Sequence, residues 1–487
     1  MATTSTPLLS RIHAAGAGLS FTIAVVLALA ANFIWANGHD QQRCIELVIL
    51  GLALAVALAR GALARAAQAL TPPQAVLCLT FLALGAASTV GAVSPGHALA
   101  EWSMFVLLGL ASLVIAAEVA AAGTPGLYRL LPLLAAICAL YSLRLLLAYG
   151  AALAAGAQLN FQTLAIGFSN ARFLNHAQTA LLPMLVLLAR PPASRMTARL
   201  CFALVAFWWA LIFVSEARAT VLALLIGGGV AWLLLRRRAQ RWLLTLAASA
   251  LAGLLVYAVL FIALPLALGM SPLGTPDNIL ARSAADPASG RQFLWTRGLK
   301  LIARHPLLGV GPQHFAHFGR DLQIGAHPHD WLFQVATEWG VPALLCLLAL
   351  LLLGAHACKR TVDGIGTADT ARHEVATAFI VALAAIVADG LFSGVLVMPQ
   401  SQLAIALVFG MAIGWVRSQQ PAPLAASTPR RAGRYLAPLL GVLALGIALA
   451  VIGPDLGRKW EGAPLDAQEQ AHNPGMHWPR LWEAGYF

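Results

Sequence analysis

Long apolar stretches recur along nearly the whole chain, and they decide what it can fold into. A helix needs about 20 mostly apolar residues to cross the roughly 30 Å hydrocarbon core of a bilayer. Hydrophobic residues make up 60% of the 487 positions and charged residues only 10%, whereas a soluble domain carries about 25% charged residues. The sequence shows no ten-residue segments of alternating polarity, which are typical of an outer-membrane barrel. We therefore predict an all-α integral membrane protein with many spans.

Twelve or thirteen transmembrane helices are predicted, because neighbouring short segments could merge. The predicted spans lie at residues 16–36, 44–60, 74–93, 101–121, 128–149, 176–190, 198–215, 219–235, 242–269, 330–355, 373–396, 400–417 and 435–453. They divide the chain into a first part of the bundle, an outer segment with its own helix, a second part of the bundle and a tail, at residues 1–269, 270–330, 331–453 and 454–487.

Clusters of positive charge between the apolar runs predict the orientation. Five loops rich in Arg and Lys, among them "RRRAQR" (236–241), fall on one side of the predicted membrane. The positive-inside rule makes that side cytoplasmic. The formal net charge of +12 is therefore interpreted as a topology signal and not as a nucleic-acid-binding surface. The turn 215–220, the segment 270–330 and the tail 454–487 are then expected on the opposite, outer side.

The outer segment 270–330 is long compared with the other predicted loops, which is typical of a functional segment. Within it, "RQFLWTRGLKLIARHP" (291–306) predicts a helix with one apolar face. Arg297, Lys300 and Arg304 recur at helical spacing on another face. A basic amphipathic helix that contains a Trp is typical of the membrane–water interface.

The stretch "GAHPHDWLFQVATEWG" (325–340) places polar residues at the start of an apolar run. Asp330 is predicted to be the N-cap of the helix that follows, which leaves His329 at the aqueous mouth of the bundle. Asp330, Gln334 and Glu338 follow one another at intervals of four residues and form one polar stripe. Because such a stripe is costly in lipid, we expect it to face the protein interior. An ordinary polar helix entrance is the alternative interpretation.

Two arginines are expected on the same outer side as His329. Arg218 lies in the turn "SEARAT" (215–220), and Arg291 begins the predicted interfacial helix. Guanidinium groups bind phosphate oxygens in a planar fork, and imidazole exchanges its proton near neutral pH. The three side chains therefore fit a lipid-linked diphosphate. Pairing of Arg218 with Glu216, and simple interfacial anchoring by Arg291, are the alternatives.

Metal chemistry is disfavoured by the distribution of acidic residues. A metal-dependent transferase needs paired carboxylates or a complete set of ligands at suitable spacing. His327 and His329 could form half of a zinc site, but no third ligand is nearby in the sequence. The acidic residues around them occur singly, at Asp277, Asp286, Asp321 and Asp330. We therefore predict metal-independent chemistry without a cofactor.

Three blocks of the chain resemble those of the O-antigen ligase and O-antigen polymerase family. They are "SEARATVLALL", "SGRQFLWTRGLKLIARHPLLGVGPQHF" and "HPHDWLFQVATEWG", in the usual order over about residues 215–340. The superfamily also contains bacterial O-linked oligosaccharyltransferases. Many relatives have Ser-Arg in the first block and His-Asn in the third. Here Ala217 precedes Arg218, and Asp330 follows His329.

The resemblance implies a GT-C-like inner-membrane enzyme that acts on the periplasmic side. Such an enzyme would move O-antigen from undecaprenyl diphosphate to lipid A–core, with inversion and without a metal. Arg218 and Arg291 would hold the diphosphate, and His329 would activate the acceptor hydroxyl. Asp389 in "VADGLFSG" resembles a further functional acidic position, with a structural carboxylate as the alternative. Secondary candidates are His327, Asp330 and Glu338.

Other functions stay open at this point. A protein O-oligosaccharyltransferase is the nearest alternative, because the tail "HWPRLWEAGYF" (477–487) resembles aromatic C-terminal segments of protein-glycosylating relatives. An O-antigen polymerase with the same donor comes next. A glycolipid transporter would need charged residues spread through several spans. The sugar, the acceptor hydroxyl and the oligomeric state are not specified by the sequence.

Overall fold

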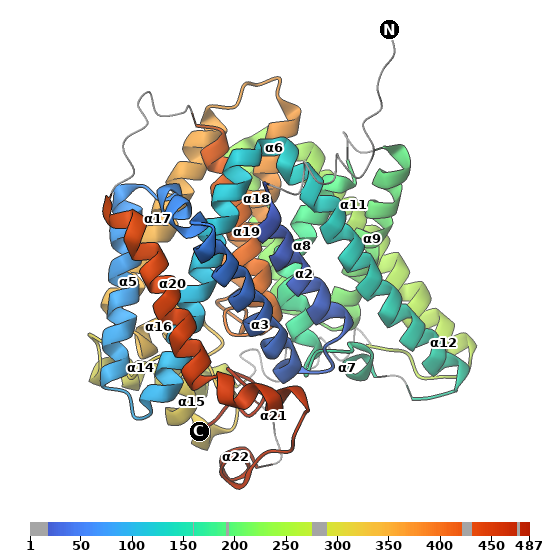
Figure 1. Ribbon diagram of the computed structural model, residues 1–487. Coiled ribbons are helices and arrows are strands. Elements are labelled where there is room, and N and C mark those ends of the chain that lie inside the picture. Colours follow the sequence, from blue (N-terminus) through green and yellow to red (C-terminus); the bar gives the residue numbers. More distant parts are fainter. Residues whose placement is uncertain (1–17, 159, 191–193, 275–289, 421–430, 475–477) are drawn as a thin grey trace.

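The computed structural model describes residues 18–158, 160–190, 194–274, 290–420, 431–474 and 478–487. Over these residues the chain forms a helical bundle without a strand (Figure 1). Nine of the described helices are long and apolar enough to cross a membrane, or ten if one bent pair at Tyr435–Val451 and Gly453–Trp460 counts as a span. The predicted all-α polytopic fold is confirmed.

The main helices of the first half are α2 (Ser20–Ile34), α3 (His39–Ala59), α4 (Ala62–Ala66), α5 (Pro72–Val90), α6 (Pro95–Ala154), α7 (Phe161–Leu164), α8 (Ala171–Leu188), α9 (Arg195–Val214), α10 (Arg218–Leu235), α11 (Gln240–Tyr257) and α12 (Leu264–Ala267). Those of the second half are α14 (Arg291–Arg304), α15 (Phe315–Phe318), α16 (Trp331–Glu338), α17 (Val341–Asp363), α18 (Thr370–Asp389), α19 (Pro399–Ser418), α20 (Arg431–Val451), α21 (Leu456–Trp460) and α22 (Ala467–His472).

Helix α6 contains two of the predicted spans, 101–121 and 128–149. It runs for 60 residues but is interrupted at Gly123, whose backbone is not helical (φ 62°, ψ −163°). Glycine adopts a positive φ without steric cost, and Pro125 follows two residues later. The two spans are therefore joined by a kink and not by a loop.

The predicted span 330–355 is wrong in its boundaries. Residues 330–355 form two helices, α16 and α17, which are separated at Gly340 (φ 89°, ψ 163°). A β-carbon at Gly340 would lie 2.2 Å from the main-chain oxygen of Leu307, so the chain crosses itself closely at this point. Val341 then donates a hydrogen bond to the Pro306 oxygen at 2.8 Å. As a result, α16 is a short separate helix. The predicted span 373–396 similarly ends earlier, at Asp389.

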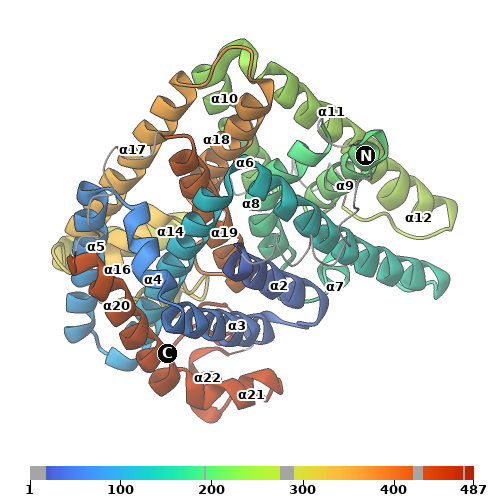
Figure 2. The same ribbon diagram turned by 45° about the horizontal axis from the view of Figure 1, so that its top comes forward.

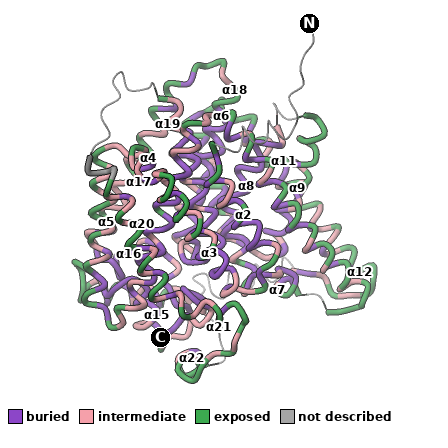
Figure 3. Tube along the Cα trace, in the orientation of Figure 1, coloured by how far each residue is buried: buried purple, intermediate pink, exposed green. Residues whose placement is uncertain are grey.

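The bundle has an interior layer and an outer layer (Figures 2 and 3). In the apolar windows of α18 and α19, 72% and 78% of the residues are buried, against 6% for α17 and 17% for α5. Helix α8 is an interior helix, because only Arg172 and Phe173 of its residues are not buried. The exposed apolar faces of α5 and α17 suit contact with lipid chains. Polar residues on α8 are therefore enclosed by protein.

Short helices gather at one end of the bundle. Helices α14, α15, α16, α21 and α22 lie together at the bottom of Figure 1, with the last residue of the chain among them. At this same end, the turn between α9 and α10 contacts α8 through Ser215 and Asn175. The end of α18 contacts the start of α16 through Gly390 and Trp331. The predicted outer segment and the start of α16 are therefore part of one structure.

Candidate active site

Asp330 caps α16 as predicted. Its Oδ1 accepts hydrogen bonds from the backbone N–H groups of Leu332 at 2.8 Å and Phe333 at 3.1 Å. Burial raises the pKa of this carboxyl, and the two backbone hydrogen bonds act in the opposite direction. Because both bonds satisfy the first turn of the helix, the main contribution of Asp330 is to start α16 immediately after His329.

The start of α16 rests on the end of α18. The Trp331 backbone N–H donates to the Gly390 oxygen at 3.0 Å. Its indole Nε1 donates to the Val387 oxygen at 3.2 Å. Asp389, the last residue of α18, lies between these two acceptors in the chain. The structure therefore joins the His329 loop to the helix end that carries Asp389, although 60 positions separate His329 from Asp389 in the sequence.

His329 and His327 lie side by side in a tight loop, with their ring planes tilted by 53°. His329 has a left-handed backbone (φ 53°), and its N–H donates to Nδ1 of His327 at 3.2 Å. The two ring centroids are 4.0 Å apart. A β-carbon at Gly325 would lie 2.9 Å from Nε2 of His329, so the loop passes close over this ring. Because Nδ1 of His327 accepts a hydrogen bond, that ring is neutral with its proton on Nε2.

The surroundings keep both imidazoles neutral. The pKa of His329 is lowered to about 3, most strongly by burial and then by the nearby positive charges of Arg291, His176 and Arg172. Burial and the neighbouring His329 lower the pKa of His327 well below its ordinary value. A neutral imidazole has a lone pair that can accept a proton. His329 is therefore in the form that a general base requires.

We expect a pH profile that reflects this lowered pKa. In the free enzyme, His329 stays neutral when the pH falls below 6.5, because its pKa is about 3. The value of kcat/KM, which reports groups of the free enzyme, should therefore be constant from about pH 8 down to about pH 5. Initial rates at limiting donor, with a stability check at each pH, would measure this. An acidic limb with its midpoint near pH 6.5 would show that His329 titrates as a water-exposed imidazole.

Arg291 is the first residue of α14, the helix predicted at 291–306. That prediction is confirmed, and Leu294 and Leu301 form its buried face. Trp295 attaches α14 to the histidine loop, because its Nε1 donates to the Pro328 oxygen at 3.2 Å. Its ring also stacks on Phe333 of α16, with centroids 6.1 Å apart. These contacts hold the start of α14 beside His329, where the charge of Arg291 acts on the imidazole.

Arg218 is the first residue of α10 and follows a turn at Ser215 and Glu216. The turn is tied to α8, because Asn175 donates from Nδ2 to Ser215 Oγ at 2.9 Å. Thr220, two residues after Arg218, lies with its hydroxyl 3.3 Å from that of Thr179 on α8. The first turn of α10 is therefore held against the interior helix.

Helix α8 also holds Asp389. Thr179 donates its hydroxyl proton to Oδ2 of this carboxylate at 2.7 Å, and Asp389 is completely buried. The same threonine thus connects the start of α10 with the end of α18. Sequence reasoning missed His176 and Thr179, although a run of polar residues, "NHAQT" (175–179), within an apolar span was visible. Buried polar residues in a span are expected at functional sites.

Glu338 lies at the other end of α16, away from His329. Its Oε1 accepts from the Phe315 N–H at 3.0 Å, and its Oε2 lies 2.6 Å from Nη2 of Arg480. Burial raises the pKa of Glu338 to about 7, and the charge of Arg480 opposes this shift. The predicted polar stripe does face the interior, since Asp330, Gln334 and Glu338 are all buried. The geometry gives Glu338 a tethering contact and not a contact with the histidines.

Within the part of the chain that the structure describes, no group of three or more His, Cys, Asp or Glu side chains is arranged to hold a metal ion. Asp277 and Asp286 lie outside the described residues. Metal independence is therefore still a prediction, to be tested by experiment.

Residues 202–348 match the family model described as O-antigen ligase. This match, over about a third of the chain, supports an assignment to the O-antigen ligase family. The matched region begins in α9 and ends in α17, and it therefore includes Arg218, Arg291 and the histidine loop. No curated protein matches the chain. An O-antigen ligase family member is expected to have glycosyltransferase-type activity on lipid-linked glycans. The family includes ligases and polymerases, so membership alone does not distinguish between them.

Proposed function

We propose that the protein is an O-antigen ligase, which moves O-antigen from undecaprenyl diphosphate to lipid A–core at the periplasmic face of the inner membrane. The observation that carries this proposal is the partly buried imidazole of His329, whose pKa is lowered by burial and by the nearby positive charge of Arg291. A base and a cation next to each other suit attack by a hydroxyl on a sugar whose leaving group is an anion. The family match and the helical bundle support a lipid-linked donor.

In the proposed reaction, an acceptor hydroxyl oxygen attacks the anomeric carbon, and the bond from that carbon to the diphosphate oxygen breaks with inversion. His329 takes the hydroxyl proton, a step that contributes roughly 10²–10⁴-fold in general-base catalysis. Arg218 and Arg291 bind the diphosphate and stabilise the negative charge that develops on the departing oxygen. Asp389 is proposed as a second catalytic group, which stabilises the imidazolium formed on His329.

Two further members of the superfamily are alternatives for the acceptor. The aromatic tail favours a protein O-oligosaccharyltransferase as the second candidate, and a polymerase would add the glycan to another lipid-linked chain. A glycolipid transporter, the candidate from a different class, fits less well, because the candidate polar residues gather at one end of the bundle. Each alternative predicts a different product.

Deletion of the gene distinguishes these products. We expect surface O-antigen to be lost while undecaprenyl-diphosphate-linked polymer accumulates. If surface O-antigen persists and periplasmic glycoproteins disappear, the protein glycosylates proteins instead. If single repeat units still reach lipid A–core but long chains do not, it is a polymerase. Complementation with the parent gene, measured in the same strain, is the control.

Activity should survive chelation. Because the proposed site stabilises the diphosphate with Arg218 and Arg291, we expect the purified protein to ligate glycan at an unchanged rate in EDTA. Radiolabelled donor and lipid A–core in detergent would measure the rate. A loss in EDTA that magnesium, manganese or calcium restores would contradict the arginine mechanism and would favour a metal held by Asp330 and Asp389.

A further inference from the structure

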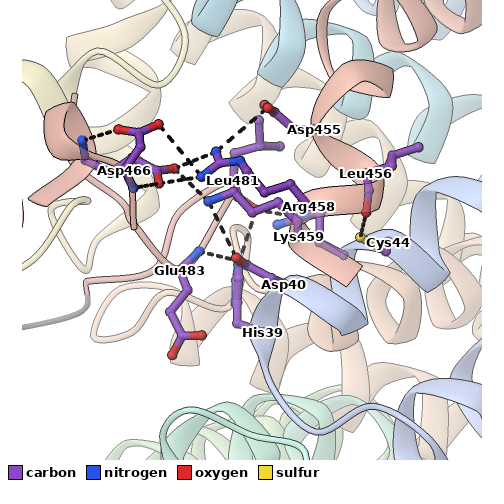
Figure 4. A network of polar contacts seen from close by, with 12 residues as sticks. His39, Asp40, Cys44, Asp455, Leu456, Arg458, Lys459, Asp466, Leu481 and Glu483 are labelled. Atoms are coloured by element: carbon purple, nitrogen blue, oxygen red, sulfur yellow. Dashed lines mark hydrogen bonds and ion pairs between the residues drawn. The ribbon is translucent and has the colours of Figure 1, made fainter. Parts of the chain in front are cut away.

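The described residues of the tail (454–487) fold back onto α3. Lys459 of α21 forms an ion pair with Glu469 of α22 at 2.7 Å, and its Nζ lies 3.7 Å from Oδ2 of Asp40 (Figure 4). Asp40 also accepts a hydrogen bond from the backbone N–H of Glu483 at 2.5 Å (Figure 4). The described parts of the tail are therefore attached to the N-terminal end of a membrane-spanning helix on both sides of α22.

Beyond α22, the tail enters the interior through Arg480, which is 1% exposed. Its guanidinium contacts Glu101 of α6 at 2.6 Å and Glu338 of α16 at 2.6 Å. Its Nη1 donates to the main-chain oxygen of Ala326 at 3.1 Å. A buried carboxylate without a partner is strongly destabilising. One tail residue therefore connects α6, the end of α16 and the loop that leads to His327.

Tyr486 holds the same loop from the next turn of the tail. Its hydroxyl accepts a hydrogen bond from the Gly325 N–H at 3.0 Å, and the side chain is 2% exposed. The ring packs with Ala316 and Ala326 in a small apolar cluster. Gly325 also lies close to His329, since a β-carbon at Gly325 would be 2.9 Å from Nε2 of His329. Tyr486 and the His329 ring therefore both lie against Gly325.

The loop needs support of this kind because His329 has a left-handed backbone, a conformation that persists only when the surroundings impose it. Asp330 and Trp295 hold the second half of the loop, at the start of α16 and at Pro328. In the first half, Gly325 donates to Tyr486 and Ala326 accepts from Arg480. The tail therefore holds the first half of the loop, and Asp330 and Trp295 hold the second half.

We propose that Tyr486 and Arg480 are positioning residues for the glycosyl transfer: the tail fixes the loop 325–330 and so places the His329 imidazole for reaction. This inference rests on the proposed function for the reaction, but its structural part can be tested without it. Neither residue contacts the proposed reacting atoms. Their effect should therefore fall on turnover and not on binding of the donor.

Tyr486→Phe is the sharpest test, because it removes only the hydroxyl and keeps the buried ring. We expect kcat to fall about three- to tenfold while KM for the undecaprenyl-diphosphate-linked donor stays within about twofold, as loss of one hydrogen bond implies. Tyr435→Phe is the matched control, since Tyr435 lies on α20 and is 68% exposed; it should behave as the parent. An unchanged kcat, or a raised KM alone, would overturn the positioning role.

Hydrogen exchange separates this inference from the proposed function. In Tyr486→Phe, backbone amides of residues 323–330 should exchange at least about fivefold faster than in the parent, because the Gly325 N–H loses its acceptor. Tyr435→Phe should leave them unchanged. If the parent protein ligates nothing but exchange in the loop rises, the proposed function fails and the tethering stands. If ligation occurs but neither exchange nor kcat changes, the tethering fails.

Arg480→Lys provides a second variant, because Arg480→Gln leaves two buried carboxylates without a cation and is expected to unfold. Lysine keeps the charge but cannot reach three acceptors with a planar fork. We expect Arg480→Lys to fold, with a lower kcat and faster exchange at residues 323–330 than the parent. Parental values of both would remove Arg480 from the positioning role.

Discussion

Replacement of His329 by Ala should lower the kcat for ligation at least ~100-fold and leave donor binding nearly unchanged, as expected for loss of a general base. The imidazole is kept neutral by burial and by Arg291, so it can accept the acceptor proton. The variant removes this proton acceptor and leaves the proposed diphosphate contacts of Arg218 and Arg291 in place. Ligation rates with purified lipid-linked donor and lipid A–core would measure kcat, and equilibrium binding of the donor would measure affinity.

His329→Asn is the control for this experiment, because the backbone at position 329 is left-handed (φ 53°). Alanine is strained in that conformation, whereas asparagine adopts it more readily. A large loss in both variants therefore indicates lost chemistry and not a collapsed loop. If His329→Asn turns over at nearly the parental rate, His329 is not the base. His327, whose ring lies 4.0 Å away between centroids, then becomes the candidate.

Arg218→Lys and Arg291→Lys should each lower the ligation rate about ten- to a hundredfold. If each guanidinium binds diphosphate oxygens through two parallel hydrogen bonds, lysine keeps the charge but loses the fork. Loss of a charge-assisted contact that strengthens toward the transition state costs about 1.5–3 kcal/mol, which corresponds to that range of rates. Rates at matched protein levels in nanodiscs would measure the effect.

Arg304→Lys is the matched control, because Arg304 lies on the same helix as Arg291 but is exposed at its far end. It should ligate at the parental rate. If Arg218 only pairs with Glu216 and Arg291 only anchors an interfacial helix, both lysine variants would also be close to parental, and the arginine mechanism would be wrong. One strongly impaired variant would identify the arginine that faces the leaving group.

Local sequence patterns determined the helices and the start of the site. Apolar length predicted the spans, because each helix satisfies its own backbone hydrogen bonds in lipid and needs a fixed number of apolar residues to cross it. Asp330 was predicted as an N-cap because capping acts within three residues, and the structure confirms it. The amphipathic helix 291–306 was visible in its own periodicity, and the three sequence blocks indicated the family that residues 202–348 then matched.

Tertiary structure alone decided how those elements meet. The break at Gly340 has apolar residues on both sides, so hydropathy continues across it; the close approach of Leu307, which requires glycine there, exists only in the folded chain. Thr179 and Asp389 meet over 210 positions, and Arg480 and Glu338 over 142. Periodicity tells which face of a helix is buried but not which residue lies opposite. That choice depends on side-chain packing between distant helices, so the partners of the polar residues on α8 and the position of the tail under the histidine loop became visible only in the structure.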